Sequence, residues 1–155
     1  MNSAAVTELV PDRVSVADIG AGAGLPGIPL AILRPDLTVD LVESLLRRTN
    51  FLTHTVDDLG ITSRVAVLRA RAEDLSRRYD VVLSRALAPL DRLVRWCQPL
   101  LSEGGTILAI KGSAAEQEIA EHSGLLRRSG LAAEVVSCRL DDDVPPTTVV
   151  RLHER

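Results

Sequence analysis

The fold is decided by one stretch near the start of the chain, Val16-Ala-Asp18-Ile-Gly20-Ala-Gly22-Ala-Gly24-Leu-Pro26-Gly27. Apolar residues from Val14 to Ile19 predict a buried strand, and the apolar run 28–33 after the glycines predicts a helix. A strand, a glycine turn and a helix form the first half of a nucleotide-binding βαβ unit. Glycine suits this turn because the backbone adopts positive φ there and a ligand can approach it closely. The stretch therefore predicts a ligand site at the end of the first strand.

The glycine spacing alone leaves the class of ligand open. Gly20-x-Gly22-x-Gly24 fits the sites of S-adenosylmethionine-dependent enzymes, whereas Gly22-x-Gly24-x-x-Gly27 fits the dinucleotide fingerprint. Asp18 favours S-adenosylmethionine, because its carboxylate would repel a pyrophosphate but attract a sulfonium and an ammonium group. The alternative for Asp18 is a purely local role, in which its side chain caps the turn through backbone amides.

Length and composition limit the classes of protein that the chain can be. The 155 residues, 46% of them hydrophobic, suffice for one domain with a substantial core, and we expect residues 1–155 to form a single domain. No apolar run approaches the ~20 residues of a membrane span. Two cysteines without metal-ligand spacing favour a cytoplasmic protein with no bound metal. The net charge of −3 and aromatic content of 2% argue against an independent RNA-binding module that stacks bases on aromatic rings.

Predicted strands and helices alternate along the chain. We expect the end of a helix at 2–10, helices at 28–34, 45–59, 89–101 and 114–128, five strands at 14–18, 37–42, 65–68, 79–84 and 106–110, and a closing strand pair at 135–139 and 148–152. This alternation predicts an α/β fold with a mostly parallel seven-stranded sheet and helices on both faces. Ligands of such sheets bind beyond the carboxyl ends of the strands.

Charged residues follow those carboxyl ends. Glu43 lies about 20 residues beyond the glycine turn, where a carboxylate can hold ribose hydroxyls, although it could instead cap the helix that begins near Leu45. Ala72-Glu73 follows the third strand, where the adenine ring of a nucleotide would lie, with a helix-dipole contact as the alternative for Glu73. Arg85 and Lys111 end the fourth and fifth strands, and their alternatives are a surface salt bridge and a solvated strand end. We therefore expect a site formed by several strand ends.

Other polar residues give no sign of chemistry. Arg47-Arg48 and Arg77-Arg78 are expected on solvated helix faces. The three histidines, at positions 54, 122 and 153, lie too far apart in sequence to show metal-ligand or catalytic spacing. Since no Ser-His-Asp, Cys-His or paired-carboxylate pattern occurs, covalent and hydrolytic catalysis have no support.

A set of motifs occurs along the chain in a recognisable order and spacing. They are Asp18–Ile32, Glu43–Arg48, Asn50–Leu52, Arg71–Glu73, Ser84–Ala86, Ala88–Leu90 and Leu108–Gly112. In these motifs the chain resembles the bacterial RsmG/GidB family, which modifies guanine N7 in 16S ribosomal RNA. The resemblance covers nearly the whole chain, and its most specific part is the Leu-Pro-Gly-Ile-Pro run at 25–29.

The resemblance implies a Rossmann-like class I methyltransferase fold and transfer of a methyl group from S-adenosylmethionine to guanine N7 of the small-subunit RNA. The family's cofactor positions fall on Gly20, Leu25, Ala72-Glu73 and Arg85, with Glu43 at the ribose. Combined with the turn itself, this gives an expected cofactor-binding set of Asp18, Gly20, Gly22, Gly24, Leu25, Glu43, Ala72, Glu73 and Arg85.

The same resemblance implies how the acceptor is treated. Guanine N7 carries a lone pair and no proton, so its attack on the sulfonium methyl needs no general base. Arg85 and Lys111, which matches a family lysine at the active-site mouth, are the expected catalytic residues, holding a phosphate or guanine O6. The expected partner is 16S ribosomal RNA or the small ribosomal subunit, and we expect the protein to be a monomer.

The chain departs from the family pattern at its start. Family members carry a helical N-terminal region with an Arg-His-x-x-Asn/Asp-Ser motif, and only Asn2-Ser3 corresponds to the end of that motif here. We therefore expect a complete cofactor site, but poor or no RNA methylation by the 155 residues alone and activity in a version extended at its N-terminus. The alternative functions are a cofactor-binding or assembly module without turnover and, less favoured by Asp18, an NAD-dependent dehydrogenase.

The only two cysteines are Cys97 and Cys138. They fall in elements that neighbour one another in the second half of the expected sheet, so a redox-sensitive contact is conceivable. A reducing cytoplasm and the apolar surroundings favour two free, buried thiols instead.

Overall fold

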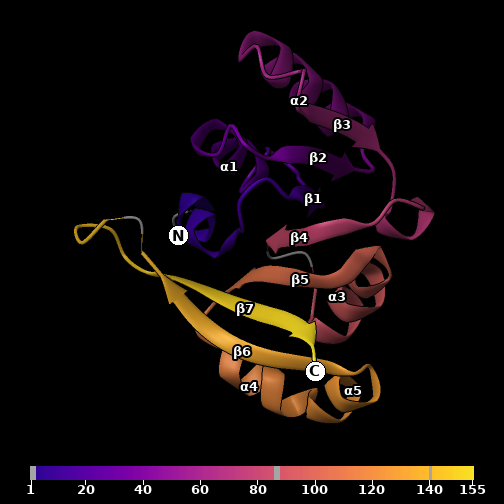
Figure 1. Cartoon of the computed structure of the whole chain (residues 1–155), viewed down its shortest axis with the longest axis vertical. Coiled ribbons are helices and arrows are strands. Elements are labelled where there is room, and N and C mark those ends of the chain that lie inside the picture. The colour runs from indigo at the N-terminus through magenta and orange to yellow at the C-terminus, as the bar shows by residue number, and fades with distance from the viewer. Residues whose placement is uncertain (1–2, 86–87, 140) are drawn as a thin grey trace.

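The sheet at the centre of the molecule has seven strands in the order β3-β2-β1-β4-β5-β7-β6 (Figure 1). The structure, a computed structural model, describes residues 3–85, 88–139 and 141–155. The strands are β1 (Ser15–Ile19), β2 (Thr38–Glu43), β3 (Val65–Arg69), β4 (Tyr79–Arg85), β5 (Leu101–Lys111), β6 (Leu131–Cys138) and β7 (Thr147–Glu154). Pairs within β1–β5 are parallel, and β7 runs antiparallel to both of its neighbours. The predicted mostly parallel seven-stranded sheet is confirmed.

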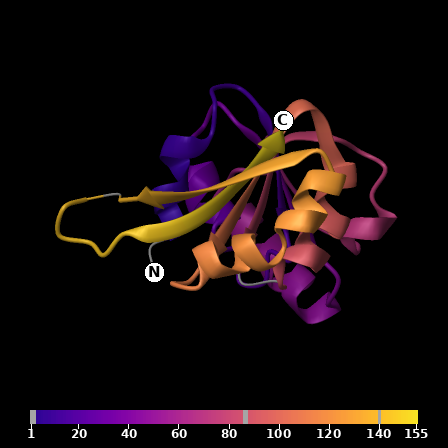
Figure 2. The same ribbon diagram turned by 90° about the horizontal axis from the view of Figure 1, so that it is seen from below.

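Helices cover both faces of this sheet. They are the 3-10 helices η1 (Ser3–Leu9), η2 (Ala72–Asp74) and η3 (Gln98–Leu100) and the α-helices α1 (Gly27–Leu33), α2 (Leu46–Asp58), α3 (Leu90–Cys97), α4 (Ala115–Glu121) and α5 (Ser123–Arg128). One core cluster joins the sheet to η1, α1 and α2, and the other joins it to η2, α3, α4 and α5. Figure 2 shows α4 and α5 on the opposite side of the sheet from the N-terminal helix. Within the described ranges, no helix combines the length and apolar character needed to cross a membrane.

The structure corrects three of the expected element boundaries. Strand β5 begins at Leu101 rather than at 106, because Pro99 ends the preceding helix early and Leu101 pairs with Tyr79. The expected helix at 114–128 is divided at His122, shortly before Gly124, which is a poor helix former. The first segment is a 3-10 helix. Two parts of the sequence motifs, Asn2 and Ala86, lie outside the described residues.

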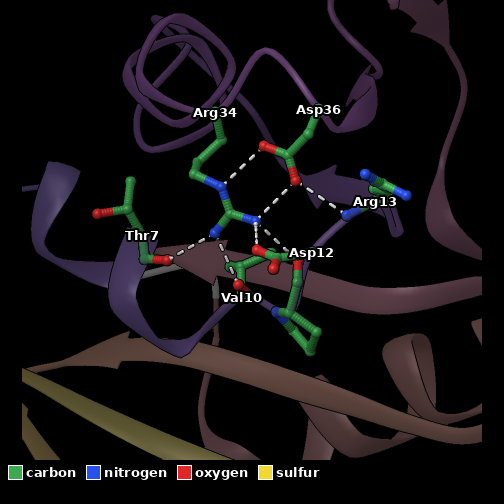
Figure 3. Close-up of polar contacts among 7 residues, drawn as sticks. Thr7, Val10, Asp12, Arg13, Arg34 and Asp36 are labelled. Carbon is green, nitrogen blue, oxygen red and sulfur yellow. Dashed lines mark hydrogen bonds and ion pairs between the residues drawn. The ribbon is translucent and has the colours of Figure 1, made fainter.

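The guanidinium of Arg34 fastens the start of the chain to the end of α1 (Figure 3). Its Nη1 donates to the main-chain oxygens of Thr7 and Val10, at 3.3 and 2.8 Å. Its Nη2 lies 2.8 Å from carboxylate oxygens of both Asp12 and Asp36, and its Nε donates to Asp36 at 2.9 Å. Because the five N–H groups of arginine are rigidly arranged, one side chain can hold several acceptors in a fixed geometry. This clasp fixes η1 and the following turn against the helix that begins at the glycine turn.

The two cysteines lie on opposite faces of the sheet. Cys97, at the end of α3, packs in the cluster under α3–α5, whereas Cys138, at the end of β6, packs in the cluster under η1, α1 and α2. Both are buried and free. Burial raises the pKa of Cys97 to about 12 and also raises the pKa of Cys138. The prediction of free, buried thiols is confirmed, and the alternative of a redox-sensitive contact between them is wrong.

Both thiols should therefore resist modification while the protein is folded. We expect a thiol reagent to label neither cysteine in the native, unreduced protein and to label both after addition of denaturant, because only the exposed thiolate reacts rapidly. Counting reacted thiols by mass spectrometry checks this. Two thiols that appear only after a reductant is added would contradict it.

Candidate functional site

The glycine turn joins the end of β1 to the start of α1. Gly20, Gly22 and Gly24 have φ values of 71°, 57° and 85°, in the left-handed region that favours glycine. Gly27 is needed for a different reason. A Cβ on Gly27 would lie 2.4 Å from Leu41 Cδ2 and 2.7 Å from Asp18 Oδ2, so a larger residue would displace α1. The turn therefore brings the first turn of α1 into direct contact with the last residues of β1.

Asp18 occupies the centre of that contact and is almost fully buried, with 1% of its surface exposed. Its Oδ2 accepts a hydrogen bond from the Gly27 N–H at 2.9 Å, whereas its Oδ1 has no hydrogen-bond partner among the described residues. Burial raises the pKa of Asp18 to about 7, although the Gly27 hydrogen bond and the positive charge of Arg85 oppose the shift. The local capping role is thus real, and it leaves one carboxylate oxygen unused.

Glu43, at the end of β2, is the second buried acid of the site, at 5% exposed. Its Oε2 accepts from the Gly22 N–H and its Oε1 from the Leu45 N–H, each at 3.0 Å. The Arg48 guanidinium lies 3.7 Å from Oε2. Glu43 therefore connects the glycine turn to Leu45, the residue that precedes α2, although this helix has no side-chain capping hydrogen bond at its N-cap. Each carboxylate oxygen has two lone pairs, so both can still accept a hydroxyl donor.

A cleft of about 420 Å³ lies at the carboxyl ends of β1, β2 and β3. This volume lies in the range of small-molecule sites. Four of the expected cofactor residues form part of its wall: Gly20, Glu43, Ala72 and Glu73. Ile19 and Val42 add apolar surface. Among the described residues, the other expected ones do not line it: Asp18, Gly22, Gly24, Leu25, Arg85 and Lys111.

Arg85 and Lys111 lie at the same edge of the sheet, at the ends of β4 and β5. Arg85 is half-buried on the strand next to β1, and its charge acts on Asp18. The Lys111 side chain is only 10% exposed, and its Nζ donates to the Ala88 carbonyl at 2.7 Å and to Glu118 at 2.9 Å. The alternative of a solvated strand end is therefore wrong for Lys111, since its ammonium has two protein partners.

Comparison with known proteins places this geometry in a family. Residues 1–143 match the GidB family, described as "rRNA small subunit methyltransferase G". The chain belongs to this family. It is 54% identical over 155 residues to the Ribosomal RNA small subunit methyltransferase G of a Nocardioides species, covering 98% of this chain and 62% of that relative. The chain spans about two thirds of the length of the curated relatives that it matches.

Solved structures of other methyltransferases share the fold of this GidB-family chain. The ribosomal protein L11 methylase of Lactobacillus delbrueckii subsp. bulgaricus aligns with a TM-score of 0.75 at 15% identity, covering 97% of this chain and 75% of that one. Coclaurine N-methyltransferase, solved with N-methylheliamine and SAH, aligns with a TM-score of 0.59 at 20% identity, covering 68% and 34%. The expected Rossmann-like class I methyltransferase fold is thus confirmed.

Trp96, Arg48 and Arg71 are among the cleft-wall residues of this GidB-family chain that were not predicted as site residues. Trp96, from α3, is the only tryptophan, and no spacing connects it to the glycine turn. Arg48 was expected on a solvated helix face, and it is indeed 58% exposed, but it also lies beside Glu43. Arg71 belongs to a family motif without an assigned role. Within the described ranges, no three His, Cys, Asp or Glu side chains are grouped so that they could hold a metal ion.

The buried charge of Asp18 should make stability depend on pH. The folded pKa of about 7 exceeds the ordinary 3.8, so the folded protein binds this proton more tightly than the unfolded chain. The free energy of unfolding should therefore fall as pH rises from about 4 to about 7. Asp18→Asn removes this dependence and retains an oxygen for Gly27. The variant should gain about 2–3 kcal/mol over the wild type between pH 5 and pH 8.

Urea unfolding at several pH values measures this difference. Denaturation curves for Asp18→Asn and the wild type that stay parallel from pH 5 to pH 8 would contradict it.

Proposed function

We propose that the cleft binds S-adenosylmethionine and that the protein transfers the methyl group to guanine N7 of 16S ribosomal RNA. The observation that carries the cofactor assignment is the buried, unpartnered Oδ1 of Asp18 directly under a glycine turn. A negative group in this position suits a ligand with an ammonium and a sulfonium group and repels a pyrophosphate. The family description supports a ribosomal RNA acceptor, and the SAH in coclaurine N-methyltransferase supports this cofactor class.

The placement of the residues supports proposals for the remaining cofactor roles. We propose that Glu43 accepts hydrogen bonds from the ribose hydroxyls, because it is fixed by Gly22 and Leu45 and still has free lone pairs. Ala72 and Glu73 would border the adenine, where the small Ala72 side chain leaves room for a flat ring. We propose that the methionine part lies against the glycine turn, formed by Gly20, Gly22, Gly24 and Leu25, with Asp18 behind the turn. Of these residues, Gly20 lines the cleft itself.

For this methyl transfer, the main task of the protein is to orient the cofactor and the acceptor base. Bound S-adenosylmethionine supplies an electrophilic methyl group, which the N7 lone pair takes as the carbon–sulfur bond breaks, and no proton is transferred. In-line positioning of the reacting groups can contribute ~7–11 kcal/mol in well-oriented cases. We propose that Arg85 and Lys111 hold the acceptor nucleotide, because both lie at the edge of the sheet that bears the cleft. Their charges suit a phosphate or guanine O6.

The partner, oligomeric state and location remain predictions. We propose 16S ribosomal RNA or the small ribosomal subunit as the partner, and a cytoplasmic monomer without a bound metal as the working form. Sedimentation of the purified protein at several concentrations would test the monomer.

Cofactor binding is the first test. Titration with S-adenosylmethionine and with SAH should change the fluorescence of the single tryptophan, Trp96, because it lines the cleft, and NAD should produce no such change. Glu43→Ala should weaken SAH binding by about 10-fold or more, the usual loss for hydrogen bonds to a charged group. Calorimetry gives the affinities.

Two variants control for indirect effects of Glu43→Ala. Glu103→Ala removes an exposed acid of β5 and should bind SAH normally. Glu43→Gln keeps an oxygen for one of the two backbone N–H groups and should bind SAH with intermediate affinity. Wild-type affinity in Glu43→Ala, with native circular dichroism, would limit Glu43 to its hydrogen bonds with Gly22 and Leu45.

Methyl transfer is the second test. With labelled S-adenosylmethionine and protein-free 16S RNA, the label should appear on guanine N7, and Arg85→Ala should slow transfer by about 10-fold without altering the circular dichroism spectrum. Arg127→Ala, an exposed arginine at the end of α5, serves as the matched control. The rates are compared among variants of this chain. Equal rates for the two variants would remove Arg85 from the acceptor site.

A further inference from the structure

Glu118, a residue of α4 that no sequence motif singles out, connects three segments at the cleft edge of the sheet. Its Oε1 accepts from Lys111 Nζ at 2.9 Å and from the Leu90 backbone N–H at 2.5 Å. Lys111 in turn donates to the carbonyl of Ala88 at 2.7 Å. The Lys111 and Glu118 side chains are 10% and 19% exposed. One carboxylate oxygen therefore holds the end of β5 and the start of α3 together.

This contact fulfils a need of α3. The first N–H groups of a helix have no partners within the helix, and Pro89, at the N-cap, makes no side-chain capping hydrogen bond. Glu118 supplies an acceptor for the first of these N–H groups from a different helix. Charged hydrogen bonds of this kind are stronger than neutral ones, and partial burial strengthens them further. The position of the first turn of α3 thus depends on a side chain 28 residues away in the sequence.

The two groups held by Glu118 belong to elements that lie at the carboxyl edge of the sheet or carry a residue of the cleft wall. Lys111 ends β5 at the carboxyl edge of the sheet, beside β4 and Arg85. Helix α3 begins at Leu90 and carries Trp96, which lies on the cleft wall. Helices α3 and α4 pack on the same face of the sheet, in one shared core cluster. A shift at Leu90 would therefore be transmitted along one short helix to the cleft.

We propose that Glu118 is a positioning residue for methyl transfer. It holds the Lys111 ammonium in a fixed direction and sets the start of α3, and through these two groups it orients the acceptor side of the cleft. This role rests on the proposed function. The contacts of Glu118 with Lys111 and Leu90 are independent of that function. Glu118 touches neither the cleft nor the glycine turn, so the affinity for SAH should not change when it is replaced.

Two replacements separate the two contacts. Glu118→Gln keeps an oxygen for the Leu90 N–H and loses the charge that faces Lys111. Glu118→Ala loses both. Glu116→Gln, an exposed acid in the first turn of the same helix, is the matched control.

Two readouts test the contacts without requiring activity. Hydrogen exchange at the Leu90 amide should be about 10-fold faster or more in Glu118→Ala than in the wild type. The exchange rate should increase less in Glu118→Gln and should not change in Glu116→Gln. Acetylation of Lys111, the only lysine, should accelerate in both Glu118 variants, and peptide mass spectrometry reports it without interference from other lysines. The single-turnover rate of RNA methylation is the third readout, with SAH affinity measured beside it.

The expected result is faster Leu90 exchange, faster Lys111 acetylation and an approximately 10-fold slower methyl transfer in Glu118→Ala at wild-type SAH affinity. If the contacts loosen but transfer keeps its wild-type rate, Glu118 is only structural and the proposal is wrong. The proposal is also wrong if Leu90 exchange and Lys111 acetylation in Glu118→Ala are as slow as in the control Glu116→Gln. If the wild type neither binds SAH nor transfers a methyl group, the proposed function fails, and the two contact readouts alone decide whether Glu118 holds Lys111 and Leu90.

Discussion

The hydrogen bond from the Gly27 N–H to the Asp18 carboxylate is the contact on which the site depends. It joins the last residues of β1 to the first turn of α1 across a gap that has no room for a Cβ. The hydrogen bond therefore holds together the two ends of the glycine turn, which lies between these two residues. Glu43 then accepts from Gly22 and joins the same turn to β2 and the start of α2. Two buried acids thus fix the backbone of the turn before any ligand enters.

Asp18 lowers the stability of the folded protein when it is ionised. Asp18 has an unpartnered oxygen in an almost fully buried position, and its raised pKa reflects the cost of holding charge there. A cation in the turn would relieve this cost, because it favours the ionised carboxylate. Strain of this electrostatic kind is common where a protein is organised for binding rather than for maximal stability.

The sequence predicts the sheet well because its information is local. Apolar strands, the glycine turn and the alternation of elements identify all seven strands, and the charged residues at strand ends identify Glu43 and Ala72-Glu73 on the cleft wall. Contacts between distant segments are not visible in such patterns. The pairing of Leu101 with Tyr79 lengthens β5. Trp96 lines the cleft from α3, the helix that follows β4 in the chain.

Lys111 illustrates the same limit at one residue. Its position after a strand predicts a place at the carboxyl edge of the sheet, which is correct. Its two partners, Ala88 and Glu118, follow from the packing of α3 and α4 and have no sequence signature. The sequence therefore predicts at which edge of the sheet such a residue lies. The hydrogen-bond partners of its side chain depend on tertiary contacts that the sequence does not display.

The strand order has a consequence for synthesis on the ribosome. β7 lies between β5 and β6, although it is made after both. Until residues 147–154 have left the exit tunnel, β6 has no neighbouring strand and β5 has one free edge. The parallel half, β1 to β4, can pair earlier, since all its partners are already made. The nascent chain thus carries an open sheet edge until β7 is made, and β7 closes it.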